Sequence, residues 1–238
     1  MISIVLIGTE SSENLGAVCR VMKNFGFRDL ILVNPKCSKD DIKAEIVSKH
    51  AYDILKHAKV RKQLRGFDYV VGTTAKIGGD YNIVRTPLSP EQAAEKLSML
   101  SSTRVALVFG PESTGLNNEF LKKCDFIINI PASDYGTLNL SHAVAIILYE
   151  LFKHKGLKPK IEPMSSVEKQ VLNKKFSRIA KELFSRDRAK IEVQMWRRLV
   201  GQSTLSKREA FTLLGFLTKV ENEMNLNKRK NQEPRAGS

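Results

Sequence analysis

Residues 105–112 read Val105-Ala106-Leu107-Val108-Phe109-Gly110-Pro111-Glu112, an apolar run of five residues that leads into a glycine, a proline and an acid. Two earlier segments, Ile4–Gly8 and Tyr69–Gly72, are also apolar runs that end in glycine. Short apolar runs rich in β-branched residues are typical of strands buried on both faces of a parallel sheet. Ligands bind at the carboxyl edge of such sheets, so we expect the functional residues in the loops after these glycines.

The first 150 residues alternate strand-like runs with helical patterns, which predicts an α/β fold built on a parallel sheet with helices on both faces. Further strands are predicted at Leu30–Val33 and Phe126–Ile130. Helices are predicted over 14–25, over 41–58 with Ser38 at the start, from Ser89, and from Leu140.

The charge is concentrated in the last third of the chain. Residues 1–150 hold 18 Lys+Arg against 16 Asp+Glu, whereas residues 151–238 hold 21 against 9, within a total net charge of +14. This asymmetry favours a nucleic acid as partner, with a solvated helix face as the simpler alternative. We expect an α/β domain at 1–155, a linker at 156–164, a basic all-helical domain at 165–224 and a disordered tail at 225–238.

The cysteines and the N-terminus bear on location. Cys19, Cys37 and Cys124 are odd in number and lack the spacing of a metal site, which favours a reducing compartment, so we expect a cytoplasmic protein. No apolar stretch approaches the roughly 20 residues of a membrane span, and Met1–Gly8 predicts a strand rather than a signal peptide. We expect neither a metal nor a membrane partner.

Three loops carry clustered polar residues and glycines. The first holds Asn14-x-Gly16-x-x-x-Arg20, the second Phe109-Gly110-Pro111-Glu112-x-x-Gly115-Leu116, and the third runs from Ile130-Pro131 to Leu138-Asn139-Leu140-Ser141. None is a phosphate loop with a lysine or a Gly-x-Gly-x-x-Gly turn, so nucleotide hydrolysis and NAD binding have no support. Taken singly, each has a simpler interpretation: a helix cap at Asn14, a surface ion pair at Arg20 and a tight turn after Phe109.

Together, in this order and spacing over about 150 residues, the three segments resemble the motifs of the SPOUT methyltransferases. Within that class they are similar to the TrmH/TrmJ group of RNA ribose 2′-O-methyltransferases. Leu32-Val33-Asn34-Pro35 and the helical extension are most similar to the TrmJ tRNA methyltransferases. The resemblance implies a deep trefoil knot within about residues 105–150, an exception to the rule against threaded chains, together with a small all-α C-terminal extension.

The resemblance also implies the activity, S-adenosylmethionine-dependent methylation of a tRNA ribose 2′-oxygen, at nucleotide 32 of the anticodon loop (cytidine and/or uridine), by a homodimer. It implies catalytic roles for Arg20, Asn14 and Asn139. Either the arginine receives the hydroxyl proton, or it clamps a phosphate and stabilises charge on oxygen, which suits a permanently protonated guanidinium better. The cofactor pocket implied by the motifs comprises Thr73, Gly110, Glu112, Gly115, Ile130, Thr137 and Leu138.

The basic C-terminal third is expected to contact tRNA phosphates. Its densest cations are Arg186, Arg188, Lys190, Arg197 and Arg198, and Trp196 among them is expected in the helical core. Two other functions stay open: a non-catalytic RNA-binding protein with this fold, and a 2′-O-methyltransferase that acts on rRNA. A base methyltransferase of the same class is weaker, because such enzymes lack the Asn-x-Gly-x-x-x-Arg loop.

Overall fold

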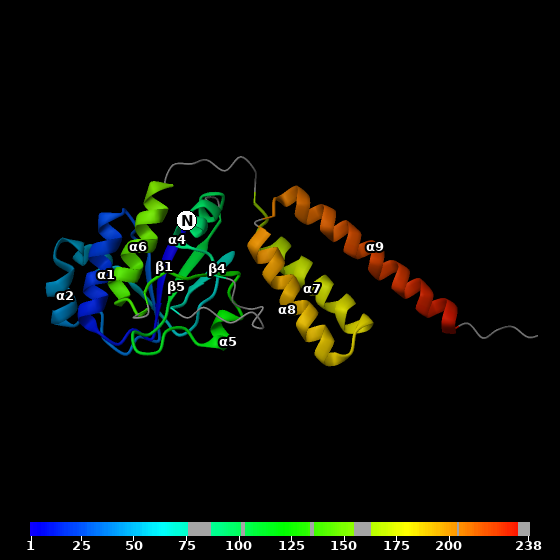
Figure 1. Cartoon of the computed structure of the whole chain (residues 1–238), viewed down its shortest axis with the longest axis horizontal. Coiled ribbons are helices and arrows are strands. Elements are labelled where there is room, and N and C mark those ends of the chain that lie inside the picture. The colour runs from blue at the N-terminus through cyan, green and yellow to red at the C-terminus, as the bar shows by residue number, and fades with distance from the viewer. Residues whose placement is uncertain (76–86, 101–102, 134–135, 155–162, 204, 233–238) are drawn as a thin grey trace, which may run out of the picture. The chain divides into compact units, whose positions relative to one another are not determined.

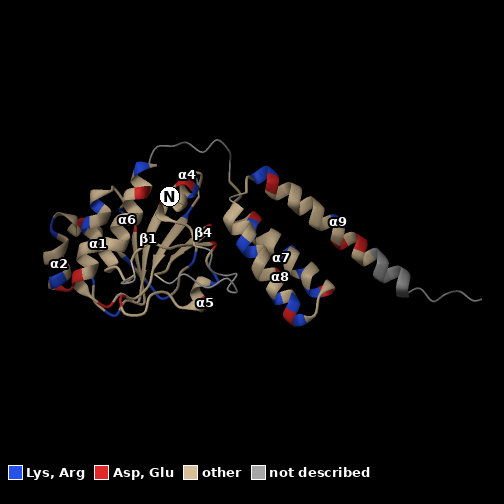
Figure 2. Cartoon of the chain, in the orientation of Figure 1, with Lys and Arg blue, Asp and Glu red and all other residues tan. Residues whose placement is uncertain are grey.

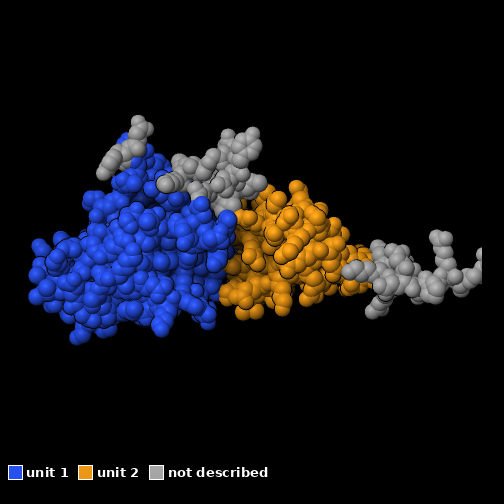
Figure 3. Space-filling model, turned by 90° about the horizontal axis from the view of Figure 1, so that it is seen from below, with its two compact units in different colours: residues 1–161 blue, residues 162–238 orange. Residues whose placement is uncertain are grey.

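The computed structural model describes residues 1–75, 87–100, 103–133, 136–154, 163–203 and 205–232. The chain divides into two compact units, Met1–Ile161 and Glu162–Ser238, which Figure 3 shows in different colours. Each unit has a hydrophobic core of its own. Most of the linker predicted at 156–164 lies outside the described residues.

Unit 1 is built on a six-stranded parallel sheet in the order β3-β2-β1-β5-β4-β6 (Figure 1). The strands are β1 (Ile2–Ile7), β2 (Leu30–Val33), β3 (Lys59–Arg61), β4 (Tyr69–Thr73), β5 (Val105–Phe109) and β6 (Phe126–Ile128). The prediction of a parallel sheet is confirmed. The sequence does not predict β3, because this three-residue edge strand is mostly charged and lacks the apolar run of a buried strand.

The helices of unit 1 are α1 (Ser12–Asn24), α2 (Ile42–Ser48), α3 (Tyr52–Lys56), α4 (Pro90–Ser98), α5 (Asn118–Leu121) and α6 (Leu140–Lys153). The single helix predicted at 41–58 is wrong. Lys49, with a φ of 48°, ends α2, and a 3-10 turn at Lys49–Ala51 leads into α3. Asp41, rather than Ser38, caps α2 by accepting a hydrogen bond from the Lys43 N–H. Ser89 and Gln92 form the predicted capping box of α4.

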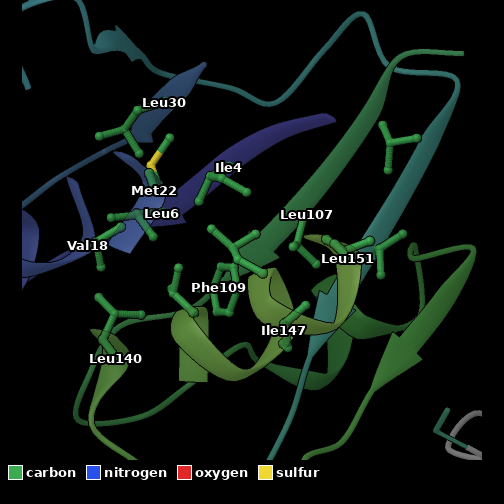
Figure 4. Packing of buried hydrophobic residues seen from close by; sticks show 14 of the residues in the cluster. Ile4, Leu6, Val18, Met22, Leu30, Leu107, Phe109, Leu140, Ile147 and Leu151 are labelled. Carbon is green, nitrogen blue, oxygen red and sulfur yellow. The ribbon is translucent and has the colours of Figure 1, made fainter. Parts of the chain in front are cut away.

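Alternate strand residues face two different layers, as the period of two requires. On one face, residues such as Ile4, Leu6 and Leu107 pack against α1, α2, α3, α4 and α6 in the larger core. Figure 4 shows part of this core, with side chains from the strands, α1 and α6. On the other face, Val5, Ile31 and Val108 are covered more thinly, by α5 and by loop residues that include Leu64 and Phe67. Helices therefore lie on both faces, but unevenly. Within the described residues, no helix is both long and apolar enough to cross a membrane.

Unit 2 is all-helical, with α7 (Ser166–Leu183), α8 (Arg186–Ser203) and α9 (Lys207–Gln232). Capping boxes at Ser165 and Ser206 start α7 and α9 within the region predicted to be all-helical. The core holds Met164, Leu172, Ile179, Val200, Ala210 and Leu217. Trp196 packs against this core and stacks on Phe176 with ring centroids 4.2 Å apart, which confirms its predicted place.

Two predicted boundaries of unit 2 are wrong. Met164, expected in the linker, is fully buried, because an apolar residue directly before the cap of α7 packs onto the helical core. The predicted disorder of 225–238 fails for 225–232, since α9 continues to Gln232. Helix propagation adds a hydrogen bond for each residue fixed, so a polar segment of Asn, Lys, Arg and Gln can extend an established helix. Residues 233–238 lie outside the described residues. The knot stays a prediction.

Candidate active site

The register of the sheet brings the three motif loops to one edge. Leu6 of β1 pairs with Phe109 of β5, Gly72 of β4 with Val108, and Thr73 with Ile128 of β6. Because the strands are parallel, their carboxyl ends and the loops that follow lie together. β2 and β3 follow β1 on one side of the sheet. On the other side β1 borders β5, beyond which lie β4 and β6, so the strand order changes direction between β1 and β5. Ligands of open α/β sheets bind at such a change of direction.

The Glu112 carboxylate joins the second loop to the first. Its Oε2 accepts a hydrogen bond from the Glu10 N–H at 2.9 Å, and its Oε1 accepts from the Ser11 N–H at 3.3 Å and from Asn14 Nδ2 at 3.1 Å. The Ser11 hydroxyl in turn caps α1 at the Asn14 N–H. The side chain predicted to line the cofactor pocket therefore holds the loop that begins α1.

Asn14 extends this contact to the third loop. Asn139 Nδ2 donates to Asn14 Oδ1 at 2.9 Å, and Asn139 Oδ1 accepts from the N–H and the hydroxyl of Ser141 at 2.9 and 2.8 Å, which caps α6. Only one orientation of the two amides is compatible with these hydrogen bonds, because a carboxylate accepts and does not donate. Glu112, Asn14, Asn139 and Ser141 thus form one hydrogen-bonded chain across three loops, which we call the loop network.

Glu10 is a second carboxylate at this edge, and the sequence does not single it out. Its Oε1 accepts from Lys36 Nζ at 2.7 Å and from the Ser113 hydroxyl at 3.0 Å, and its Oε2 accepts from the Ser113 N–H. The hydrogen bond from Lys36, followed by that from Ser113, lowers the pKa of Glu10. In the sequence, Glu10 is an acid two residues after the glycine that ends a strand. This pattern is too common to predict its partner Ser113, which lies 103 residues away.

The turn after β5 requires its glycines. A Cβ at Gly110 would lie 2.3 Å from the Gly115 carbonyl carbon and from the Leu116 nitrogen, so no larger residue fits there. Gly115 has a φ of +67° and donates its N–H to the Pro111 carbonyl at 2.8 Å. The turn folds back on itself, and the Glu112 side chain can then reach across to the first loop.

The remaining residues expected to line the cofactor pocket lie at the same edge. The Thr73 hydroxyl donates to the Val108 carbonyl at 3.1 Å and is thereby occupied. Ile130 is half-buried, Thr137 is exposed and Leu138 is 39% exposed. Within the described residues, the peptide groups of Thr137 and Leu138 form no internal hydrogen bond. This segment offers free backbone groups beside an exposed apolar side chain, a set that fits the adenosine part of S-adenosylmethionine.

Arg20 lies apart from the loop network. Six residues carry it about 240° around α1 from Asn14, and its side chain is exposed. It forms no hydrogen bond or ion pair with the part of the chain that is described. Within the described residues, Asn14 and Asn139 bond to each other and not to Arg20. An exposed, unpaired guanidinium is suited to bind a phosphate.

The basic residues predicted for α8 have different surroundings. Arg188 pairs with Glu192 and Lys190 with Asp187, whereas Arg197 faces a hollow beside α7. Arg186 is exposed, and the Arg198 side chain is half-buried. Among the described residues, no group of His, Cys, Asp and Glu could hold a metal ion.

A model of the SpoU rRNA methylase family matches residues 1–149, the part that carries the sheet and all three loops. The chain belongs to this family. A tRNA (cytidine-2′-O-)-methyltransferase TrmJ of Methanocaldococcus jannaschii is 35% identical over 225 residues, which cover 90% of this chain and 97% of that protein. A tRNA (cytidine/uridine/adenosine-2′-O-)-methyltransferase TrmJ of Pseudomonas aeruginosa is 32% identical over 92% of this chain and 93% of that protein.

A solved structure supports the same assignment over both units. The crystal structure of TrmJ from Z. mobilis ZM4 matches with a TM-score of 0.69 and 27% identity, over 93% of this chain and 99% of that one. The predicted SPOUT fold and membership of the RNA 2′-O-methyltransferases are thereby confirmed. The roles of the individual residues remain predictions, which the geometry above now makes specific.

Replacing Glu112 by Gln tests the loop network. Glutamine keeps one acceptor oxygen and turns an N–H₂ toward donors, so we expect the free energy of unfolding to fall by about 1–3 kcal/mol. The amides of Glu10 and Ser11 should exchange their hydrogens faster. The matched control is Glu119→Gln, an exposed acid paired with Lys122, which should change stability by less than about 0.5 kcal/mol. Equal effects in urea denaturation would contradict the role of Glu112.

Proposed function

We propose that the chain is an S-adenosylmethionine-dependent tRNA ribose 2′-O-methyltransferase. The observation that carries the proposal is the loop network, which assembles the three motif loops of a SpoU methylase at one edge of the sheet. The activities named for the two TrmJ relatives, which match nearly the whole chain, favour tRNA as the RNA.

S-adenosylmethionine supplies an activated methyl group on a sulfonium, so the protein's task is chiefly to bind and orient. Ile130, Thr137 and Leu138 would hold its adenosine through backbone groups and apolar contact. Gly110 and Gly115 would shape the turn beside it. Thr73 and Glu112 would support the pocket from behind, because their polar atoms are already bonded to protein. Asn14 and Asn139 would fix the loops around the ribose.

Arg20 would bind the phosphate next to the target nucleotide. Its guanidinium is a cationic hydrogen-bond donor, so it would orient the ribose 2′-hydroxyl and stabilise the negative charge that develops on oxygen. The hydroxyl proton would pass to water or to the neighbouring phosphate. The Arg20 side chain is exposed and has no acidic partner among the described residues, which supports this role. An arginine already paired with an acid would have to break that ion pair before it could bind a phosphate.

Nucleotide 32 of the anticodon loop is the proposed target, with cytidine and uridine as substrates, as the resemblance to TrmJ implies. Cytidine is named for both relatives, and uridine for one. The proposed location is the cytoplasm, supported by the free thiols of Cys19, Cys37 and Cys124. Arg186, Arg188, Lys190, Arg197 and Arg198 would add phosphate contacts from unit 2.

A homodimer is proposed on the exposed apolar row of α6. Ile146, Tyr149 and Phe152 are 37%, 51% and 47% exposed, and Phe25 of α1 lies against the last two. Apolar residues gathered on one helix face are typical of a protein interface. The substitution Tyr149→Asp should dissociate the dimer in sedimentation experiments, whereas Tyr52→Asp on α3, at 40% exposure, should not. A wild-type monomer would refute the proposal.

The activity is tested with radiolabelled S-adenosylmethionine, unmodified tRNA and rRNA, and digestion of the product to nucleosides. We expect label on the ribose of tRNA and a loss of about 100-fold or more with Arg20→Ala, while cofactor affinity stays within about threefold. Arg28→Ala, which removes an exposed arginine paired with Asp53, is the control. Binding of tRNA without methyl transfer would favour a non-catalytic RNA-binding protein. Label on rRNA alone would favour a 2′-O-methyltransferase that acts on rRNA. A parallel loss of cofactor affinity would make Arg20 structural.

A further inference from the structure

A basic groove runs along the α7 side of unit 2. It encloses about 480 Å³ and is lined by Gln170, Asn173, Lys174, Ser177, Arg178, Lys181 and Arg197. Six of these residues follow one another on α7 at helical spacing and form one stripe, and Arg197 comes from α8. Figure 2 shows Lys and Arg on both helices. The lining holds four cations and no acid, and sequence reasoning singled out only Arg197.

The cations of the groove differ in whether they form ion pairs. Arg178 pairs with Glu221 of α9 at 3.0 Å, and the same carboxylate accepts from Lys175 Nζ at 2.6 Å, which ties α7 to α9. Within the described residues, Lys174, Lys181 and Arg197 have no acidic partner, and all three side chains are exposed. Arg188 and Lys190, by contrast, are paired on their own helix.

We propose that this groove binds the sugar-phosphate backbone of the RNA substrate, through Lys174, Lys181 and Arg197. The proposal rests on the proposed function and assigns the main phosphate contact of unit 2 to α7 rather than to the start of α8. Within the described part of the chain, a phosphate bound by these three side chains breaks no ion pair, whereas at Arg188 and Lys190 it competes with Glu192 and Asp187.

The dimensions of the groove suit a backbone rather than a single small anion. Lys174 and Lys181 are seven residues apart, about 10 Å along the helix, with Arg178 between them. A nucleic acid strand carries one charge per about 3.4 Å of helix axis, so the row spans more than one phosphate. Polar side chains, Gln170, Asn173 and Ser177, alternate with the cations and can bond to phosphate or ribose oxygens. None of these groups reads a base edge, so the groove would position the RNA without selecting its sequence.

The salt dependence of tRNA binding tests the groove. The test compares the wild-type chain with two variants of it. The groove variant is Lys174→Gln/Lys181→Gln, and the control variant is Arg208→Gln/Lys219→Gln. The control removes two exposed cations of α9 that have no acidic partner among the described residues. Both variants lose the same charge. The slope of the logarithm of the binding constant against the logarithm of salt concentration should become shallower by about 2 in the groove variant, one for each lost phosphate contact, and stay unchanged in the control.

The outcomes separate this proposal from the proposed function. If the wild type methylates tRNA but the groove and control variants show equal salt slopes, the groove proposal is overturned and the proposed activity stands. Absence of ribose methylation by the wild type would overturn the activity, and the slopes would still report whether the groove binds RNA. A groove variant that methylates tRNA with an unchanged KM at physiological salt would likewise contradict the groove. Circular dichroism of the groove variant should match wild type, since both lysines are exposed.

Discussion

The Glu112 carboxylate is the contact on which the arrangement of the site depends. It is an acid from the loop after β5 that accepts two backbone N–H groups and one amide from the loop after β1. Hydrogen bonds to a charged acceptor are worth roughly 1.5–3 kcal/mol each. Because the carboxylate can only accept, it fixes the orientation of the Asn14 amide, which fixes Asn139, which caps α6. One ionised group thus sets the positions of three loops and of the starts of two helices.

The excess positive charge lies in the last third of the chain. Residues 1–150 are nearly balanced in charge, and their sheet edge presents bonded polar side chains around backbone groups that have no partner among the described residues, whereas most of the net charge of +14 lies beyond residue 150. Within unit 2, Glu221 of α9 holds Lys175 and Arg178 and so anchors the helix that carries the groove. In the proposed function, the chemistry at the sheet edge and the long-range attraction for RNA therefore come from separate parts of one chain.

The sequence predicts the parts of the fold that are encoded locally. The runs at Ile4–Gly8, Tyr69–Gly72 and Val105–Gly110 predict three strands, and the capping sequence at Ser89 predicts the start of a helix. It does not predict the break at Lys49 or the length of α9, because tertiary packing and helix cooperativity decide these. The sequence identifies the three motif loops, but it does not show which of their residues bond to one another. The Asn14 partner of Glu112 and Asn139 lies 98 and 125 residues away from them and follows only from the sheet register. The sequence does not predict the stripe of groove residues on α7, because its cations are spread at helical spacing and do not form a cluster in the sequence.

The central claim is that the three motif loops act as one unit, and a double-mutant cycle between Glu112 and Asn139 tests it most directly. These side chains do not touch each other in the loop network but share Asn14. The free energies of unfolding and the methyl-transfer rates of Glu112→Gln, Asn139→Ala and the double variant would be compared. If the loops are one network, the two losses are not additive, with a coupling of about 0.5–3 kcal/mol. Additive losses would mean that the loops are held independently and would contradict the account.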